Sequence, residues 1–261
     1  MRRLRALTAG IATYLWSGWG ALASLCMFFA LWAWAAQRYG PLVLPSPQAA
    51  FHTLAGLVAS GAAAPELAVT ARRALVGLAL AVGAGSVLGL AAGLSMTAAV
   101  AARPLVTVLM GVPPIAWLVL ALLWFGATDA TPVFTVFIAC FPIVFVGALQ
   151  GTRTLDERLR ALSRAYRLPW WQTLADVYAP HVASYLFPAW IAALGMAWKV
   201  VVMAELLASE DGVGAALAVA RAHLDTAAGL AWIAAAVGLL LALEYLVLEP
   251  IKRELERWRT I

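Results

Sequence analysis

Long apolar stretches alternate with short polar segments along the whole chain. Six of the apolar stretches contain almost no charged residue and are 20 residues long or longer. A helix needs about 20 apolar residues to cross the roughly 30 Å hydrocarbon core of a membrane. The pattern therefore predicts six transmembrane helices, over residues 14–36, 74–98, 104–126, 131–150, 182–206 and 227–248.

The composition agrees with a membrane protein built from helices. Hydrophobic residues make up 64% of the chain and charged residues 12%, and the mean hydropathy is +0.89; these values lie outside the range of a soluble domain. Lipid offers no hydrogen-bond partner to an open strand, and the apolar stretches are too long and too uniform for alternating barrel strands. We expect an all-α integral membrane protein with six transmembrane helices.

Positive charges are distributed unevenly between the predicted loops. If both chain ends lie on one side of the membrane, that side receives 13 of the 18 lysines and arginines: three in the N-terminal tail, one in the second loop, five in the fourth loop and four in the C-terminal tail. Lysine and arginine collect on the cytoplasmic side of membrane proteins. We therefore expect both termini in the cytoplasm, and we explain the basic character by topology and not by binding of nucleic acid.

The longest polar stretch, residues 151–180, lies on the same predicted side, between the fourth and fifth spans. It contains five arginines, three acids and a break at Leu168-Pro169. A polar segment between apolar spans is typical of a contact with a cytoplasmic partner. A solvated loop helix is the alternative.

Two adjacent prolines, Pro113 and Pro114, interrupt the third predicted span. Proline lacks a backbone donor and clashes with the preceding turn, so the helix must kink or unwind there. Broken backbone is tolerated inside a membrane where it faces protein or a water-filled cavity. Both prolines and the nearby Trp117 are candidates for a solute path, with a structural kink as the alternative. Pro142 predicts a second bend, in the fourth span.

Lys199 and Glu205 both lie inside the fifth predicted span. An ionisable group at membrane depth is costly and indicates a function or a partner. Helix neighbours are three or four residues apart, so a separation of six places the two side chains on different faces. Lys199 is a candidate for attracting an anionic solute; reaching the interface or pairing with a carboxylate is its alternative. Glu205 is a candidate for a gate or a packing residue.

No pattern of covalent or metal chemistry is present in the sequence. The two cysteines lie in predicted spans, the three histidines are scattered, and the chain has no phosphate-binding loop of the Walker A type. We expect a chain that is not an enzyme and binds no cofactor itself.

The order of several short motifs resembles one family of transport proteins. The motifs are Leu44-Pro45-Ser46-Pro47, the glycine-rich stretch from Thr70 to Gly93 with Arg73, Pro113-Pro114-Ile115-Ala116, Trp124-Phe125-Gly126, Phe141-Pro142-Ile143, and Leu155-Asp156 through Trp171-Gln172. Together they look like the permease subunits of binding-protein-dependent ABC importers, and most closely like the nitrate, sulfonate, taurine and bicarbonate branch.

Given this resemblance, the chain divides into three regions. Residues 1–40 form the N-terminal tail and the first span, and residues 41–70 form an external segment. The latter is expected to hold a surface helix from Gln48 to Ala59, with an ordinary connecting loop as the alternative. Residues 71–261 form the core permease domain, which includes the 151–180 loop.

The resemblance also implies a specific role for the 151–180 loop. In this family a short coupling helix after the fourth span seats in a groove of a cytoplasmic ATPase, so that closure of the ATPase moves the spans. The residues expected to make this contact are Ala161, Ser163, Tyr166, Arg167, Leu168, Trp170, Trp171 and Gln172.

Two of these positions depart from the family pattern. Ala161 stands where the family has Glu, and Arg167 stands where it has a Gly that allows positive φ. Arg167 therefore predicts a different turn geometry. Three explanations are open: an ATPase that coevolved with this loop, a second permease subunit with the usual residues, or weakened coupling.

The resemblance implies a permease subunit of an ATP-driven importer in the bacterial inner membrane. Its partners would be cytoplasmic ATPase subunits that bind ATP and Mg, a second permease subunit of the same or another kind, and an external binding protein that delivers a small anionic solute. The path would run between the permease subunits, beside Pro113, Pro114, Trp117, Pro142, Lys199 and Glu205. The alternatives are a secondary transporter, against which the lack of an inverted repeat argues, and a non-transporting membrane scaffold.

Overall fold

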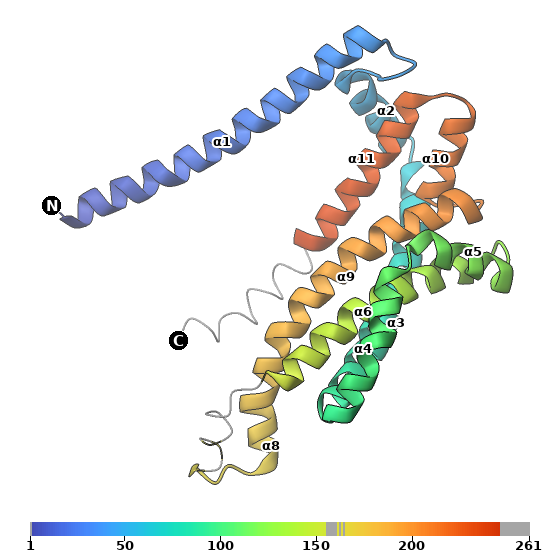
Figure 1. Ribbon diagram of the computed structural model, residues 1–261. Helices are drawn as coiled ribbons and strands as arrows, with labels where there is room; N and C mark the ends of the chain where they lie inside the picture. The colour runs from blue at the N-terminus through green and yellow to red at the C-terminus, as the bar shows by residue number, and fades with distance from the viewer. Residues whose placement is uncertain (1, 155–160, 162, 164, 246–261) are drawn as a thin grey trace.

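The computed structural model describes residues 2–154, 161, 163 and 165–245, and the regular structure in this part of the chain is helical throughout (Figure 1). The helices are α1 (Arg2–Tyr39), α2 (Pro47–Ala59), α3 (Ala63–Gly93), α4 (Met96–Gly111), α5 (Pro114–Phe125), α6 (Ala130–Arg153), α8 (Trp170–Gln172), the π-helical turn η1 (Thr173–Tyr178), α9 (Ala179–Ala208), α10 (Val213–Ala222) and α11 (Thr226–Leu243).

Within the described residues, five helices are long and apolar enough to cross a membrane: α1 from Trp19 onward, α3, α6, α9 together with η1, and α11. The sixth candidate is the pair α4 and α5, which pass the same test together but meet at an angle of 90°, as in a broken span or a re-entrant loop. The predicted all-helical membrane fold is confirmed. The described residues hold five membrane-length helices and one bent pair of shorter helices.

The break between α4 and α5 falls at the predicted double proline. The N–H of Val112 still donates to the carbonyl of Val108, over 3.1 Å, but Pro113 has no N–H to continue the helix. Pro114 then opens α5 at the first helical position, where a fixed φ suits proline. The expected kink is therefore present, as a full change of chain direction.

Helix boundaries differ from the predicted spans where charged or polar residues lie inside helices. α3 begins at Ala63, although the second span was expected to start at residue 74. Glu66, Arg72 and Arg73 interrupt the apolar pattern there, but they lie within the helix. Likewise, the helix that continues into α9 begins at Trp170, inside the predicted 151–180 loop. In both cases the helix extends beyond the apolar run from which the span was predicted.

The centre of the fold is formed by α3, α6 and α9, and glycines on α3 set how closely α6 approaches. A Cβ atom added at Gly85 would lie 2.9 Å from Cβ of Val144, and one at Gly89 would lie 2.5 Å from the carbonyl oxygen of Phe145. At Gly93 the nearest atom, Cβ of Thr152, would be 2.5 Å away. The spacing of four residues therefore forms a ladder of small residues that permits close helix packing.

Two peripheral features complete the fold. The helix expected from Gln48 to Ala59 is present as α2, where the hydroxyl of Ser46 accepts a hydrogen bond from the N–H of Ala49 and caps the first turn. Figure 1 shows α1 projecting away from the central helices and joined to α2; Trp32 Nε1 donates to the carbonyl of Pro45 over 3.0 Å.

Sequence reasoning missed α10, an alanine-rich helix that follows the Gly212 turn and packs on α9 and α11.

Candidate functional site

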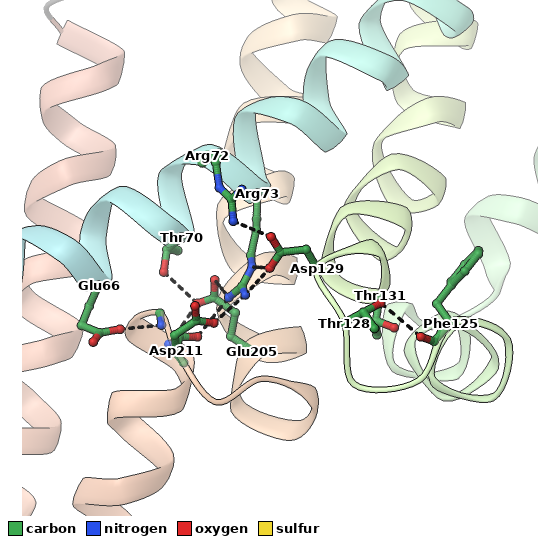
Figure 2. Close-up of polar contacts among 12 residues, drawn as sticks. Glu66, Thr70, Arg72, Arg73, Phe125, Thr128, Asp129, Thr131, Glu205 and Asp211 are labelled. Carbon is green, nitrogen blue, oxygen red and sulfur yellow. Dashed lines mark hydrogen bonds and ion pairs between the residues drawn. The ribbon is translucent and has the colours of Figure 1, made fainter.

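Arg73 on α3 is the centre of a charged cluster that joins four parts of the chain (Figure 2). Its side chain is only 4% exposed. Nε donates to Oδ1 of Asp129 over 2.8 Å, Nη1 donates to Oε1 of Glu205 over 3.1 Å and to the carbonyl of Asp211 over 3.0 Å, and Nη2 donates to Oδ1 of Asp211 over 2.5 Å and also to Asp129. A guanidinium has five N–H groups, so every donor of Arg73 has a partner.

Glu205, near the end of α9, is fully buried and lies on the inner side of this cluster. Besides Arg73, its carboxylate accepts from the hydroxyl of Thr70 over 2.7 Å and from the N–H of Gly214 over 3.1 Å. The Thr70 hydroxyl in turn accepts from the N–H of Val213 over 2.8 Å. A buried carboxylate is stable only when it is paired and hydrogen-bonded, and these contacts meet both conditions.

The two glycines after α9 leave the space that Glu205 occupies. Gly212 has φ of +94°, and an added Cβ there would lie 2.5 Å from Cδ of Glu205. At Gly214 an added Cβ would lie 2.4 Å from the carbonyl oxygen of Val202. Glu66 on α3 holds the same turn, because its Oε2 accepts from the N–H of Gly212 over 2.5 Å. The turn can therefore close over the carboxylate only with glycine at these positions.

The outer side of the cluster is open to solvent. The side chains of Asp129 and Asp211 are 49% and 55% exposed, and the exposed Arg72 makes a second ion pair with Asp129. Hydrogen bonds from Arg73 hold the pKa of Asp129 below its ordinary value, and the charges of both arginines act in the same direction. Asp129 is consequently ionised at neutral pH and remains a partner of Arg73.

Sequence reasoning placed Glu205 among the candidates but missed Arg73 as its partner. The usable signal was the spacing of Glu66, Thr70 and Arg73, which are four and three residues apart and share one face of α3. Asp129 and Asp211 had no such signal, because they reach the cluster from turns between helices.

The six residues predicted for the solute path lie in different environments. Pro113 is exposed and Pro114 half-buried at the break, and the buried Nε1 of Trp117 has no hydrogen-bond partner among the described residues. Pro142 is buried inside α6, which continues without interruption through it. Lys199 is exposed on α9, whereas Glu205 is buried in the cluster. Their shared role stays a prediction.

A cavity of about 600 Å³ lies elsewhere, between α3, α6, η1 and α9. Its lining is apolar and includes Leu90, Leu174, Leu186 and Trp190. None of the predicted path residues lines it. The described residues also contain no group of three or more His, Cys, Asp or Glu side chains arranged to hold a metal ion.

The 151–180 loop presents large side chains to its surroundings. Residues 155–160, 162 and 164, together with the side chain of Trp170, lie outside the described part of the chain. Of the remaining predicted contacts, Tyr166 is 73% and Trp171 55% exposed. The others are placed as follows: Ala161, Arg167 and Leu168 are exposed, Gln172 is half-buried, and Ser163 is buried.

The turn at Arg167 corrects one prediction. Arg167 has φ of +49°, which is the left-handed conformation that the family's glycine would adopt, and not a different turn. The N–H of Leu168 donates to the carbonyl of Ser163 over 3.0 Å, the bond expected at a helix end that is closed by one left-handed residue. The hydrogen bond and the helix end impose this conformation, although it costs about 1–2 kcal/mol for a residue with a side chain.

Comparison with known proteins decides the family. A family model described as "Binding-protein-dependent transport system inner membrane component" matches residues 81–260, which is more than half of the chain. The chain belongs to this family. It is therefore a non-catalytic membrane subunit, the permease, of an ABC importer, and multi-pass insertion in the inner membrane follows from the family and the apolar helices. Membership of this family implies a binding protein and an ATPase as partners.

Individual relatives place the chain in one branch of the family. It is 31% identical over 251 residues to the taurine transport system permease protein TauC of Escherichia coli (strain K12), covering 91% of this chain and 89% of the relative. It is 31% identical over 184 residues to the putative aliphatic sulfonates transport permease protein SsuC of Bacillus subtilis (strain 168), covering 70% and 67%. The nitrate import permease protein NrtB of Leptolyngbya laminosa is 28% identical over 149 residues, covering 57% and 53%. The predicted nitrate, sulfonate and taurine branch is confirmed.

Proposed function

We propose that this permease imports a small oxyanion and that Lys199 lines its path. The relatives are named for sulfonates, taurine and nitrate, and these solutes share a compact anionic oxygen group. Lys199 is exposed on a membrane-length helix and forms no ion pair with any residue that the structure describes. This exposed cation is the observation that carries the proposal.

The position of Lys199 favours a face between two permease subunits. Pro188, Ala192, Lys199 and Leu207 are all exposed and recur at helical spacing along one side of α9. A lysine on a lipid-facing surface is costly, whereas one beside a hydrated path between subunits is not. In a path, its positive charge would lower the free energy of an anion passing between the subunits.

The two polar regions of the chain lie at opposite ends of α6. Asp129 immediately precedes this helix and the 151–180 loop begins at its other end. Twenty-four residues at helical rise span about 36 Å, the scale of a membrane. With the loop on the cytoplasmic side, as the distribution of cations favours, the Arg73 cluster is external and both termini are cytoplasmic.

The exposed side chains of the loop support its proposed role in coupling. Tyr166, Leu168 and Trp171 present apolar surface in an otherwise polar segment, and aromatic residues of this kind often carry most of the affinity of an interface. We assign the partner as the cytoplasmic ATPase, whose subunits would hold ATP and Mg. A secondary transporter would have no use for this partner, and the family membership gives that alternative and the scaffold no support.

Uptake by liposomes containing the complete transporter tests the proposal. Taurine, an alkanesulfonate and nitrate serve as solutes, each with the binding protein and with ATP inside. Lys199→Met should lower uptake of the transported anion about tenfold, the effect of about 1.4 kcal/mol, while Lys199→Arg should retain most of it. Wild-type uptake by Lys199→Met would remove Lys199 from the path, and uptake driven by an ion gradient without ATP would overturn the importer mechanism.

A further inference from the structure

We propose that the apolar cavity between α3, α6, η1 and α9 holds one acyl chain of an anionic phospholipid, from the leaflet on the side of the 151–180 loop. Arg153, at the mouth of the cavity, binds the phosphate of the headgroup. The inference goes beyond the proposed import of an oxyanion, because it concerns neither the solute path nor the contact with the ATPase.

Close helix contacts explain where the cavity lies. α6 packs closely on α3, where a Cβ added at Gly93 would lie 2.5 Å from Cβ of Thr152. It packs equally closely on α9, because a Cβ added at its Gly147 would lie 2.5 Å from Cβ of Ala189. α3 and α9 thus flank α6, and the space that remains between them, with Thr152 on its floor, is the cavity.

The depth of the cavity matches one leaflet of a membrane. Its lining on α9 runs from Ala179 to Trp190, a rise of about 16 Å, which is about half of the hydrocarbon core. Leu94 and Leu174, at one end of the lining, are exposed, whereas Leu186 toward the other end is buried. The cavity therefore opens near the membrane surface and closes near the midplane. An acyl chain has the polarity and the length to fill it.

η1 forms the wall of the cavity that belongs to the 151–180 loop. Leu174 and Tyr178 line the cavity from this turn. The N–H of Ala179 donates to the carbonyl of Leu174, five residues earlier, so the turn is wider than an α-helical one. Such π-helical turns are rare and occur frequently at functional sites. An acyl chain in the cavity contacts both this turn and α3, and so connects the end of the loop to the central helices.

Arg153 supplies the charge for a headgroup. It is exposed and directly follows Thr152, which lines the cavity. Its Nη2 donates to Sδ of Met96, two residues after the lining residue Leu94, so the guanidinium lies beside the mouth. A thioether is only a weak acceptor, and Arg153 forms no ion pair with any residue that the structure describes. Guanidinium matches the geometry of phosphate, and basic pockets between helices on the cytoplasmic side bind anionic headgroups.

Photo-crosslinking to the complete transporter tests the position of the acyl chain. The probe is phosphatidylglycerol with a diazirine near the end of one acyl chain, added to the delipidated transporter in detergent. Mass spectrometry should locate the attached lipid at the inner end of the cavity, near Leu186 and Trp190. Ala183→Trp fills the cavity and should abolish this attachment. Ala101→Trp is the control, because Ala101 is exposed on α4 and does not line the cavity.

Competition by unlabelled lipids tests the headgroup. Phosphatidylglycerol should displace the probe more effectively than phosphatidylethanolamine with the same acyl chains. Arg153→Gln should weaken the binding of phosphatidylglycerol about fivefold, the effect of about 1 kcal/mol for one cation near a membrane surface. Arg103→Gln removes another exposed arginine that does not line the cavity, and it should leave the binding unchanged. Both substitutions are at exposed positions, so this measurement does not depend on a change in the core.

Three results would overturn the proposal. Attachment spread over the lipid-facing helices, or retained in Ala183→Trp, would remove the acyl chain from the cavity. Attachment in the isolated chain but not in the complete transporter would assign the cavity to a neighbouring subunit. Equal competition by the two lipids would exclude a site for an anionic headgroup. Lipid binding is measured without solute, binding protein or ATP, so its failure is separate from a failure of the proposed import.

Discussion

The two polar regions at the ends of α6 differ in how their charged side chains find partners. In the Arg73 cluster, the charges are paired within the chain, and Arg73 and Glu205 are buried. In the 151–180 loop, aromatic and basic side chains such as Tyr166 and Arg167 remain exposed. The first region is completed by tertiary structure, whereas we propose that the second is completed by the ATPase. A polar segment in an apolar chain therefore has two different meanings, and its partners decide which applies.

The backbone shows the same contrast. At the cluster, the positive φ falls on Gly212, which has no side chain to clash with Glu205. In the loop, the positive φ falls on Arg167, and a second helix end, at Leu224 with φ of +56°, is built in the same way. There the N–H of Asp225 donates to the carbonyl of Ala220 over 2.9 Å. Strain is thus accepted at exposed helix ends but not next to the buried carboxylate.

The largest expected effect comes from removing the hub of the cluster. Arg73→Leu leaves Glu205 buried without a countercharge, which should lower the free energy of unfolding by about 3–5 kcal/mol. Thermal unfolding of the detergent-solubilised chain measures this loss. Arg72→Leu is the control on the same turn, and because Arg72 is exposed its removal should cost about 1 kcal/mol or less.

A second substitution separates charge from packing in that experiment. Adding Glu205→Gln to Arg73→Leu removes the orphaned charge but keeps the contacts to Thr70 and Gly214, so part of the lost stability should return. Equal losses for Arg72→Leu and Arg73→Leu would show that burial does not distinguish the two arginines, and the contrast between the regions would be lost.

An intermediate effect is expected where α3 and α6 connect the two regions. Gly89→Ala forces a Cβ to within 2.5 Å of the carbonyl oxygen of Phe145, and overpacking of this kind costs about 1–3 kcal/mol. Gly83→Ala is the matched control on the same helix, because no atom lies within 4 Å of the added Cβ. Unfolding temperatures of the two variants give the comparison. Equal stability would mean that α6 does not pack on α3 through this glycine ladder.

The smallest effect is expected at the strained turn of the loop. Arg167→Gly should relieve about 1–2 kcal/mol of left-handed strain, of which the greater freedom of glycine in the unfolded chain cancels about 0.5–1 kcal/mol. Leu224→Gly relieves the same strain away from the loop. Stability should rise slightly and similarly in both variants.

ATPase coupling then separates the explanations for Arg167. If stimulation by binding protein falls only in Arg167→Gly, the arginine side chain contacts a coevolved ATPase. If stimulation improves, the arginine weakens coupling in the native transporter. An unchanged ratio would assign the usual contact to the second permease subunit.

Much of the architecture could be predicted because lipid imposes a simple rule. The apolar runs and the double proline at Pro113 and Pro114 each act through local backbone requirements, and each has the expected result. The predicted start of the second span was wrong because the charges of Glu66 and Arg73 break the apolar pattern without ending the helix. The predicted turn conformation at Arg167 was wrong because the preference of arginine for negative φ was given more weight than the hydrogen bond that closes the helix end.

By itself the sequence determined that this protein is a helical membrane protein, since the length and apolarity of a span need no knowledge of its neighbours, and its motifs carried the resemblance to a permease. Only the tertiary structure decided which charges belong together. Arg73 and Glu205 are 132 residues apart, and the spacing on α3 shows that Arg73 shares a face with Thr70 but not which carboxylate it meets. Their pairing follows from the packing of α3 against α9 and from the small glycines that let the Gly212 turn close over a carboxylate.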